Sequence, residues 1–298
     1  MNPNFSALVS SIKTEIDDGL SDFIGTYQCA SPTLKEAMQY SLLNGGKRMR
    51  PVLATIVGNL LGADRNDIVN VAMAIECVHA YSLIHDDLPA MDDDDLRRGQ
   101  PTNHIKYGDA TAILAGDALQ TLAFELLTTR PMTRYGDSKR IELIKILASS
   151  SGMGGMCAGQ SIDLEATGRN ISIEQLGQLH ALKTGALLKA SIMMAAHLAP
   201  DTGEQDFEHL DIYADNIGLA FQVQDDILDV IGDSQTLGKP QGSDQSLEKS
   251  TYVSHLGVES ATEFLHSLQN KALSALEALP YNTAQLKAFT DYLVNRNH

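Results

Sequence analysis

The chain has 298 residues and carries 38 acidic against 22 basic side chains, which gives a formal net charge of −16. This charge excludes a general binder of nucleic-acid backbones, because attraction to phosphates needs a basic face. Hydrophobic residues make up 43% of the chain and charged residues only 20%, so the composition supports a substantial core and excludes intrinsic disorder.

The expected compartment follows from the cysteines and from the start of the chain. Cys29, Cys77 and Cys157 are odd in number and form no C-x-x-C pair, which is typical of buried thiols in a reducing compartment. The first 18 residues lack a basic segment followed by an apolar one, so no signal peptide is expected. The apolar stretch 186–199 is too short to span a bilayer. We expect a cytoplasmic protein with no membrane or nucleic-acid partner.

Apolar residues recur at spacings of three and four in nearly every segment, and no alternating run predicts a strand. The predicted fold class is therefore all-α, a bundle of about ten helices. In chain order the expected helices span residues 4–27, 33–44, 51–62, 66–87, 109–128, 138–158, 172–199, 203–231, 257–278 and 283–295.

Local signals support several helix starts. Ser172 with Gln175 and Asn282 with Gln285 have the spacing of a capping box. First-turn positions that tolerate a missing N–H are expected at Pro32 and Pro51. No Pro/Ser-rich linker divides the chain, so we expect one domain over residues 1–298. The polar, glycine-containing stretch 232–251 lacks helical periodicity and is expected to be a mobile lid loop.

Two aspartate clusters follow strongly apolar helical segments. In the second cluster, Asp225 and Asp229 are four residues apart and share one helix face, with Cβ atoms about 5–6 Å apart. In the first cluster, Asp86 and Asp92 would point about 240° apart on a straight helix, so the chain must bend between them. Pro89 supplies a cause for that bend. Carboxylate oxygens are ligands that Mg²⁺ prefers, and the turn glycine and terminal glutamate of an EF-hand are missing.

Basic side chains are scarce but stand where an anion could bind. Gly45 and Gly46 precede Lys47, Arg48 and Arg50 at a predicted helix start. Backbone N–H groups, the helix dipole and these cations together suit a phosphate, although the segment is not a Walker loop.

Further candidate cations each have a structural alternative. Arg97 and Arg98 could simply compensate the first aspartate cluster, Lys183 could reach from its apolar helix to solvent, and His79 could be a satisfied core residue. Lys239 and Lys249 lie in the predicted loop. No Ser/His/Asp arrangement, zinc spacing or dinucleotide motif stands out. The combined pattern favours a site for a diphosphate bound through divalent metal, with an apolar remainder of the substrate.

These motifs resemble the trans-type polyprenyl diphosphate synthases, and most closely the bacterial farnesyl diphosphate synthases. The resemblance covers essentially the whole chain and rests on residues 46–51, both aspartate motifs, Gly159-Gln160, 183–187 and Phe221-Gln222. It implies an isoprenoid-synthase fold with helices around a central cavity. It also implies a Mg²⁺-dependent prenyltransferase that joins isopentenyl diphosphate head-to-tail to dimethylallyl or geranyl diphosphate, giving farnesyl diphosphate. A homodimer is implied as well.

The resemblance also implies a role for each candidate residue. Three Mg²⁺ ions would be bound through Asp86, Asp92, Asp225 and Asp229, assisted by Asp87 and Asp226. The allylic diphosphate would be held by Arg97, Lys183, Lys239 and Lys249. Isopentenyl diphosphate would be held by Lys47, Arg50, His79 and Arg98. The developing carbocation would be faced by Thr184 and Gln222.

Product length depends on the pocket below the first motif. The family pattern places an aromatic residue five positions before the first Asp, and here that residue is Tyr81. An ideal helical wheel puts Tyr81 about 140° from Asp86 and favours Ser82 as the pocket-facing residue. The assignment of Tyr81 therefore rests on the resemblance, and Ser82 stays an alternative.

Three other functions remain in competition. The same fold could make the C10 or C20 product, which the product ladder distinguishes. A terpene cyclase would also bind a diphosphate through metal ions, but it would not need isopentenyl diphosphate. An acidic helical scaffold or divalent-ion buffer would have no use for cations such as Lys47 and Lys183 near its carboxylates.

Overall fold

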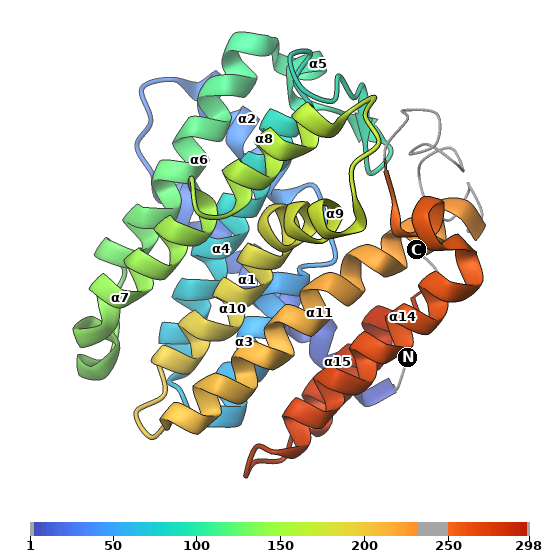
Figure 1. The fold of residues 1–298 in the computed structure, drawn as a ribbon. Helices are drawn as coiled ribbons and strands as arrows, with labels where there is room; N and C mark the ends of the chain where they lie inside the picture. The colour runs from blue at the N-terminus through green and yellow to red at the C-terminus, as the bar shows by residue number, and fades with distance from the viewer. Residues whose placement is uncertain (1–2, 232–249, 297–298) are drawn as a thin grey trace. The chain divides into compact units, whose positions relative to one another are not determined.

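The computed structural model describes residues 3–231 and 250–296, and this part of the chain is built almost entirely from helices (Figure 1). Among these residues one short hairpin, made of two strands of two residues each, follows the first aspartate motif. The elements in order are α1 Pro3–Thr26, α2 Pro32–Leu43, α3 Met49–Leu61, α4 Arg65–Asp86, β1 Leu96–Arg97, β2 Gln100–Pro101, α5 Asn103–Tyr107, α6 Asp109–Thr129, α7 Arg134–Ser151, α8 Met156–Ala166, α9 Ile173–His180, the π-helix η1 Ala181–Gly185, α10 Ala186–His197, α11 Glu204–Ile231, α14 Tyr252–Glu277 and α15 Ala284–Val294. The predicted all-α class is confirmed.

Two of the predicted helices differ from those in the structure, and in each case a glycine interrupts the regular helix. The helix expected over 138–158 is two helices, α7 and α8, and α8 continues to Ala166. They separate because Gly155 adopts φ −148°, ψ −124°, and a Cβ there would lie 2.1 Å from the Ser150 carbonyl oxygen. Similarly, α14 begins five residues earlier than expected, at Tyr252, and is kinked at Gly257, where φ is +77°.

Helix starts were predicted with mixed success. The capping box at Ser172 and Gln175 is confirmed by both reciprocal hydrogen bonds. The one expected at Asn282 is wrong, because Thr283 occupies the N-cap of α15 and Asn282 accepts a bond from the Ala284 N–H instead. The short helix α5 was not predicted. Of the cysteines, only Cys77 is buried, and the other two are half-buried free thiols.

The chain forms two compact units, which are described separately. The amino-terminal unit comprises residues 6–145 and 194–200. In it α4 packs against both α3 and α6. Most of α4 is buried, and its Glu76 carboxylate accepts a bond from buried Arg48 at 2.7 Å. A helix that is apolar on nearly all sides belongs in the centre of a core. The expectation of a single domain remains a prediction.

The carboxy-terminal unit comprises residues 3–5, 146–193, 201–231 and 250–296 of the described chain. Its long helices α11 and α14 lie side by side, with α15 packed against both (Figure 1). The short helix α9 contacts α11 and α14, and η1 lies between α8 and α11. The predicted lid over 232–251 falls almost wholly outside the described residues. Its last two residues are described, and there Thr251 caps α14.

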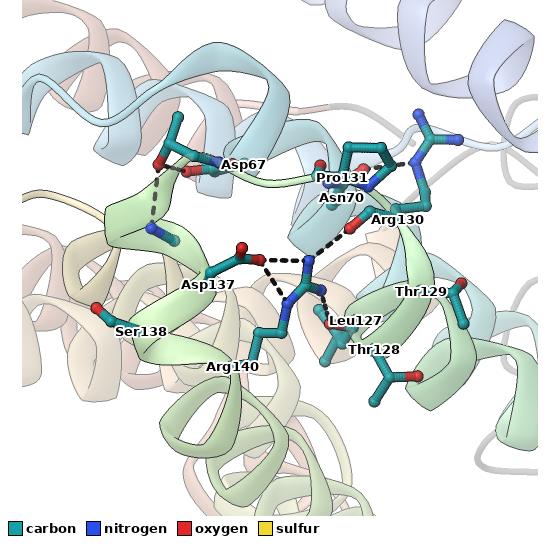
Figure 2. A network of polar contacts seen from close by, with 12 residues as sticks. Asp67, Asn70, Leu127, Thr128, Thr129, Arg130, Pro131, Asp137, Ser138 and Arg140 are labelled. Atoms are coloured by element: carbon teal, nitrogen blue, oxygen red, sulfur yellow. Dashed lines mark hydrogen bonds and ion pairs between the residues drawn. The ribbon is translucent and has the colours of Figure 1, made fainter.

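A polar network holds the start of α4 to the turn between α6 and α7 (Figure 2). The Asp67 carboxylate accepts bonds from the backbone N–H of Thr133 at 2.9 Å and from its hydroxyl at 2.6 Å. Asn70 donates to the Pro131 carbonyl and accepts from Arg130. Gly136 leaves room for Asp67, since a Cβ there would lie 2.3 Å from Oδ2. This network fixes the beginning of the helix whose other end carries Asp86.

Replacing Asp67 by Ala should destabilise the protein without changing its substrate affinity. Asp67 is 1% exposed, and its loss removes two hydrogen bonds that Thr133 donates to a charged acceptor, so we expect the free energy of unfolding to fall by about 3 kcal/mol. Asp137→Ala is the matched control, because the Asp137 side chain is 57% exposed in its ion pair with Arg140 and should contribute at most about 1 kcal/mol. Urea unfolding of both variants measures the difference, and equal losses would contradict the prediction.

Candidate active site

The first aspartate motif lies in a tight turn at the end of α4. The helix ends at Asp86, and the backbone N–H of Asp92 donates to the Asp86 carbonyl at 2.9 Å. Pro89 stands inside this turn. The bend predicted between the two aspartates is therefore confirmed. Asp86 is 8% exposed, whereas Asp92 is exposed. The turn brings the backbones of the two aspartates together at the end of an apolar helix.

Asp87 and the two arginines that follow the motif have separate partners. The guanidinium of Arg97 contacts both oxygens of Asp87, from Nε at 2.8 Å. Burial raises the pKa of Asp87, and Arg97 opposes that rise. The hairpin turn places Arg98 at φ 55°, and its Nη1 donates to the Gly45 carbonyl at 2.5 Å. Gly46 adopts φ 123°, a backbone conformation that favours glycine, and a Cβ there would also lie 2.8 Å from that guanidinium.

The basic residues at the start of α3 differ in their burial and in their partners. Arg48 is buried and pairs with Asp17 and Glu76, both at 2.7 Å. Arg50 has a buried Nε with no hydrogen-bond partner among the described residues, and burial lowers its pKa. A buried polar atom without a partner is costly, and an anion would satisfy it. Lys47 is exposed. Arg48 thus has a structural role, and the assignment of Lys47 and Arg50 as substrate contacts stays a prediction.

Four guanidinium groups act on His79. Burial lowers the pKa of His79 far below its ordinary value, and the charges of Arg50, Arg98, Arg97 and Arg48 lower it further. The imidazole is therefore neutral at physiological pH. The four arginines come from two stretches of the amino-terminal unit, residues 48–50 and 97–98. This basic cluster, defined as Arg48, Arg50, Arg97 and Arg98 around His79, is an anion-attracting region in a strongly acidic chain.

Tyr81 and Ser82 are both buried in α4, at 3% and 5% exposure. The Tyr81 ring packs edge-on against His85, with centroids 5.7 Å apart. His85 in turn fills the space beside Gly116 of α6, where a Cβ would lie 2.2 Å from the ring. Ser82 donates to the His79 carbonyl of its own helix at 2.8 Å. The assignment of Tyr81, with Ser82 as the alternative, to the floor of the product pocket stays a prediction.

In the carboxy-terminal unit, Lys183 and Thr184 lie in the π-helix η1. Such single wide turns are frequent at functional sites. Lys183 Nζ donates to the Asp163 carboxylate of α8 at 2.5 Å. Close packing holds the turn on two sides, because a Cβ on Gly159 would lie 2.2 Å from the Lys183 backbone nitrogen and one on Gly218 would lie 3.1 Å from Gly185. The Lys183 ammonium is thus fixed by a carboxylate and by a tightly packed backbone.

The second aspartate motif occupies α11 and presents its carboxylates differently. Asp225 and Asp229, on the same face, are half-buried, while Asp226 is 6% exposed. Asp226 accepts a 2.7 Å bond from the backbone N–H of Tyr252 and so anchors the start of α14. Asp225 pairs with Arg296 at 2.7 Å. The assignment of Asp225 and Asp229 as metal ligands stays a prediction, and their carboxylates are less buried than that of Asp226.

Three residues near these sites were missed from the sequence: Asp163, His180 and Arg296. Arg296 donates to the Phe221 carbonyl as well as to Asp225, and its guanidinium covers the Phe221 ring at 4.0 Å. Residues 225 and 296 are 71 positions apart, so no local pattern could have paired them. Asp163, four positions after Gly159, had only its place in an amphipathic helix as a signal. Lys239 and Lys249 lie outside the described residues.

The donor set suits magnesium. Among the described residues no three His, Cys, Asp or Glu side chains converge into a complete metal cage. The candidates instead come as carboxylates, without thiols or imidazoles, in each motif. Mg²⁺ usually binds one or two carboxylates and completes its shell with water and substrate phosphates. Pairs such as Asp225 and Asp229 fit that requirement.

Comparison with known proteins gives a consistent result. A family model described as polyprenyl synthetase matches residues 31–286. A farnesyl diphosphate synthase of Escherichia coli is 48% identical over 99% of this chain and 99% of its own length. A chloroplastic geranylgeranyl pyrophosphate synthase of Capsicum annuum is 41% identical over 99% of this chain and 79% of its own. The crystal structure of a geranyltransferase from Legionella pneumophila has a TM-score of 0.88 and 33% identity, covering 98% of this chain and 97% of that one.

Proposed function

Because this chain belongs to the polyprenyl synthetase family, we propose that it is a prenyltransferase that makes farnesyl diphosphate from isopentenyl diphosphate and dimethylallyl or geranyl diphosphate. The observation that carries the proposal is the basic cluster beside the first aspartate motif. There the buried Nε of Arg50 has no described partner, and His79 is kept neutral by burial and by the four surrounding guanidiniums. Such a region recognises a diphosphate.

Each substrate has its own set of contacts in this proposal. Isopentenyl diphosphate is bound by the basic side chains Lys47, Arg50 and Arg98 with neutral His79. The allylic diphosphate is bound by Arg97 and Lys183, with Lys239 and Lys249 as further candidates. Asp87 acts by holding the Arg97 guanidinium through both of its carboxylate oxygens. The Lys183 ammonium carries three N–H donors, so it can bind a diphosphate oxygen as well as the Asp163 carboxylate.

The carboxylates Asp86, Asp92, Asp225 and Asp229 would hold magnesium ions, which neutralise the charge that builds on a departing diphosphate. Side chains of the protein supply the other contacts to the leaving group. Arg97 and Lys183 donate hydrogen bonds to the same leaving group, and fixed donors of this kind stabilise charge without reorganisation. Thr184 and Gln222 face the allylic carbon as it becomes positive. The C=C bond of isopentenyl diphosphate then attacks that carbon, and the departed diphosphate accepts the proton that is lost.

The test is incubation of purified protein with dimethylallyl diphosphate, labelled isopentenyl diphosphate and Mg²⁺, with and without EDTA. We expect a dominant C15 product that EDTA abolishes. A C20 or longer product would keep the reaction and change the assigned product, in line with the geranylgeranyl synthase relative. A product formed from a long allylic diphosphate alone would indicate a cyclase instead. Metal binding without any product would indicate an ion-binding protein.

Replacing Tyr81 by Ala should lengthen the product. Removing this buried ring opens space between α4 and α6, so we expect the main product to shift from C15 to C20 or longer. Ser82→Ala is the control, since it removes only a hydroxyl that is bonded within its own helix. Chromatography of the dephosphorylated products measures the shift. An unchanged ladder for the Tyr81 variant would remove it from the pocket floor.

The apolar face of α6 supports a homodimer. Both α4 and α6 are long and apolar enough to cross a membrane by composition, but the apolar window of α4 is 83% buried within the protein and that of α6 only 44%. Ile113 and Leu114 of α6 are 44% and 56% exposed. We propose that a second copy of this chain covers this face. The family and the free cysteines also support a cytoplasmic location.

Leu114→Glu should convert the dimer to monomers, because a charge would be buried without a partner in the interface. Ile141→Glu is the control, as Ile141 is 77% exposed on a different helix, α7. Light scattering after size-exclusion chromatography measures the mass of both variants. A native protein that is monomeric at micromolar concentration would contradict the proposal.

A further inference from the structure

A buried histidine lies next to the π-helix and has no role in the proposed function so far. His180 is the last residue of α9 and is 9% exposed. Neither ring nitrogen, Nδ1 or Nε2, meets hydrogen-bond geometry with any described residue. A leucine would fill this space without leaving two polar atoms buried. The imidazole therefore points to a polar partner that the chain brings to it.

The surroundings of His180 hold its ring in place. It stacks on Tyr252, with centroids 5.8 Å apart and the planes 28° from parallel, and Tyr252 packs against Phe264. Tyr252 itself is fixed by the bond from its N–H to Asp226. The ring plane is thus set by α14, while the backbone of His180 leads directly into η1. Such a ring cannot turn freely to find solvent.

Gln222 is the neutral side chain close enough to act on the ring, although the pair falls short of hydrogen-bond geometry. Burial is the largest influence and lowers the pKa of His180 to about 4. Asp163 and then Gln222 oppose that fall, and Lys183 adds to it. The imidazole is therefore neutral at physiological pH, with one N–H donor and one acceptor nitrogen. Gln222 lies on α11, which packs against α9.

We propose that His180 is a positioning residue for Gln222: a rotation of the Gln222 amide brings Oε1 to the ring N–H, and the hydrogen bond so formed then fixes that amide. A carbonyl oxygen has two lone pairs, so Oε1 keeps one directed at the allylic carbon that becomes positive. Without the donor the amide can rotate and present its NH₂ group, whose partial positive charge opposes the cation. This inference rests on the proposed function, since it assigns how Gln222 is held in that reaction.

Three substitutions distinguish the effect of the His180 N–H donor from the effect of its aromatic ring. His180→Phe keeps an aromatic ring on Tyr252 and removes the N–H, so we expect kcat to fall about tenfold, the effect of one lost hydrogen bond, with an unchanged KM for isopentenyl diphosphate. His180→Asn restores an N–H donor and should recover part of kcat. Tyr252→Leu removes the stack and keeps the donor, so its kcat should fall less than that of His180→Phe. Unchanged kcat in His180→Phe would overturn the proposal.

A double-mutant cycle tests whether His180 acts through Gln222. In a Gln222→Leu background, His180→Phe should have almost no further effect on kcat, whereas an equal tenfold loss in both backgrounds would overturn the proposal. NMR of the imidazole nitrogens supplies a readout that does not need turnover. The native protein should show one fixed neutral tautomer, and Gln222→Leu should shift the ¹⁵N–H resonance. Unchanged resonances would also overturn the proposal, and because this experiment uses no substrate, its outcome is independent of whether the enzyme makes farnesyl diphosphate.

Discussion

Replacing Asp86 by Asn is expected to lower kcat by about 10³-fold or more while leaving the fold intact. The substitution removes one negative charge and nothing else from a side chain that is 8% exposed at the end of α4. A bound divalent ion contributes several kcal/mol to stabilising a leaving group, and each 1.36 kcal/mol is worth a factor of ten in rate. The Mg²⁺ concentration for half-maximal rate should also rise. Steady-state kinetics across a magnesium series measure both effects.

Asp93→Asn is the matched control for this experiment. Asp93 carries the same charge in the same turn, is exposed, and adopts φ 53°, which Asn tolerates well. Its kcat should stay within about threefold of the native value, because long-range charge effects at an exposed site are screened. If both variants lost activity equally, the effect would belong to the charge of the turn as a whole and Asp86 would not be a specific ligand.

Replacing Gly159 by Ala should displace Lys183, although Gly159 itself carries no side chain that could contact a substrate. The added methyl group would lie 2.2 Å from the Lys183 nitrogen and 2.5 Å from its Cα, both backbone atoms that cannot rotate away. Helix α8 and η1 must then separate. Misplacement of a catalytic group by about 1 Å costs about 10²-fold in rate, and overpacking of this kind costs about 1–3 kcal/mol of stability. We expect losses of that size in kcat and in the free energy of unfolding.

Gly25→Ala separates this effect from the general one of replacing a helical glycine. Gly25 lies in α1, and a Cβ there meets nothing within 4 Å. Alanine should raise helix stability at this position by about 0.5–1 kcal/mol without changing kcat. A Gly159→Ala enzyme with native kcat would show that η1 can shift without harm and would weaken the assignment of Lys183.

The sequence predicted the architecture well where a local signal was available. Apolar periodicity located most helices, and Pro89 predicted the turn that joins Asp86 to Asp92. The break between α7 and α8 was missed because glycines permit a helix break without requiring one. The π-helix was missed because its residue pattern is that of an ordinary apolar helix.

The candidate site was harder to predict than the fold because its partners are distant in sequence. Arg48 and Arg50 cannot be told apart by residue type. Only the folded chain shows that Arg48 forms salt bridges with Asp17 and Glu76. Asp163 and Lys183 are twenty positions apart, and Arg296 meets Asp225 from the end of the described chain. Such pairings depend on how helices pack, which periodicity alone does not encode.

The π-helix also affects how this part of the chain should be aligned and engineered. A π turn holds about one residue more than an α turn, so the angular phase of the helix shifts by roughly 100° between Ile173–His180 and Ala186–His197. A helical wheel drawn continuously through both segments assigns the wrong face to one of them. Deleting a single residue between 181 and 185 would restore an uninterrupted α-helix. The side chains of α9 would then be rotated about the helix axis relative to the helices on which they pack. The length of this turn, as much as the identity of its lysine and threonine, is therefore under constraint.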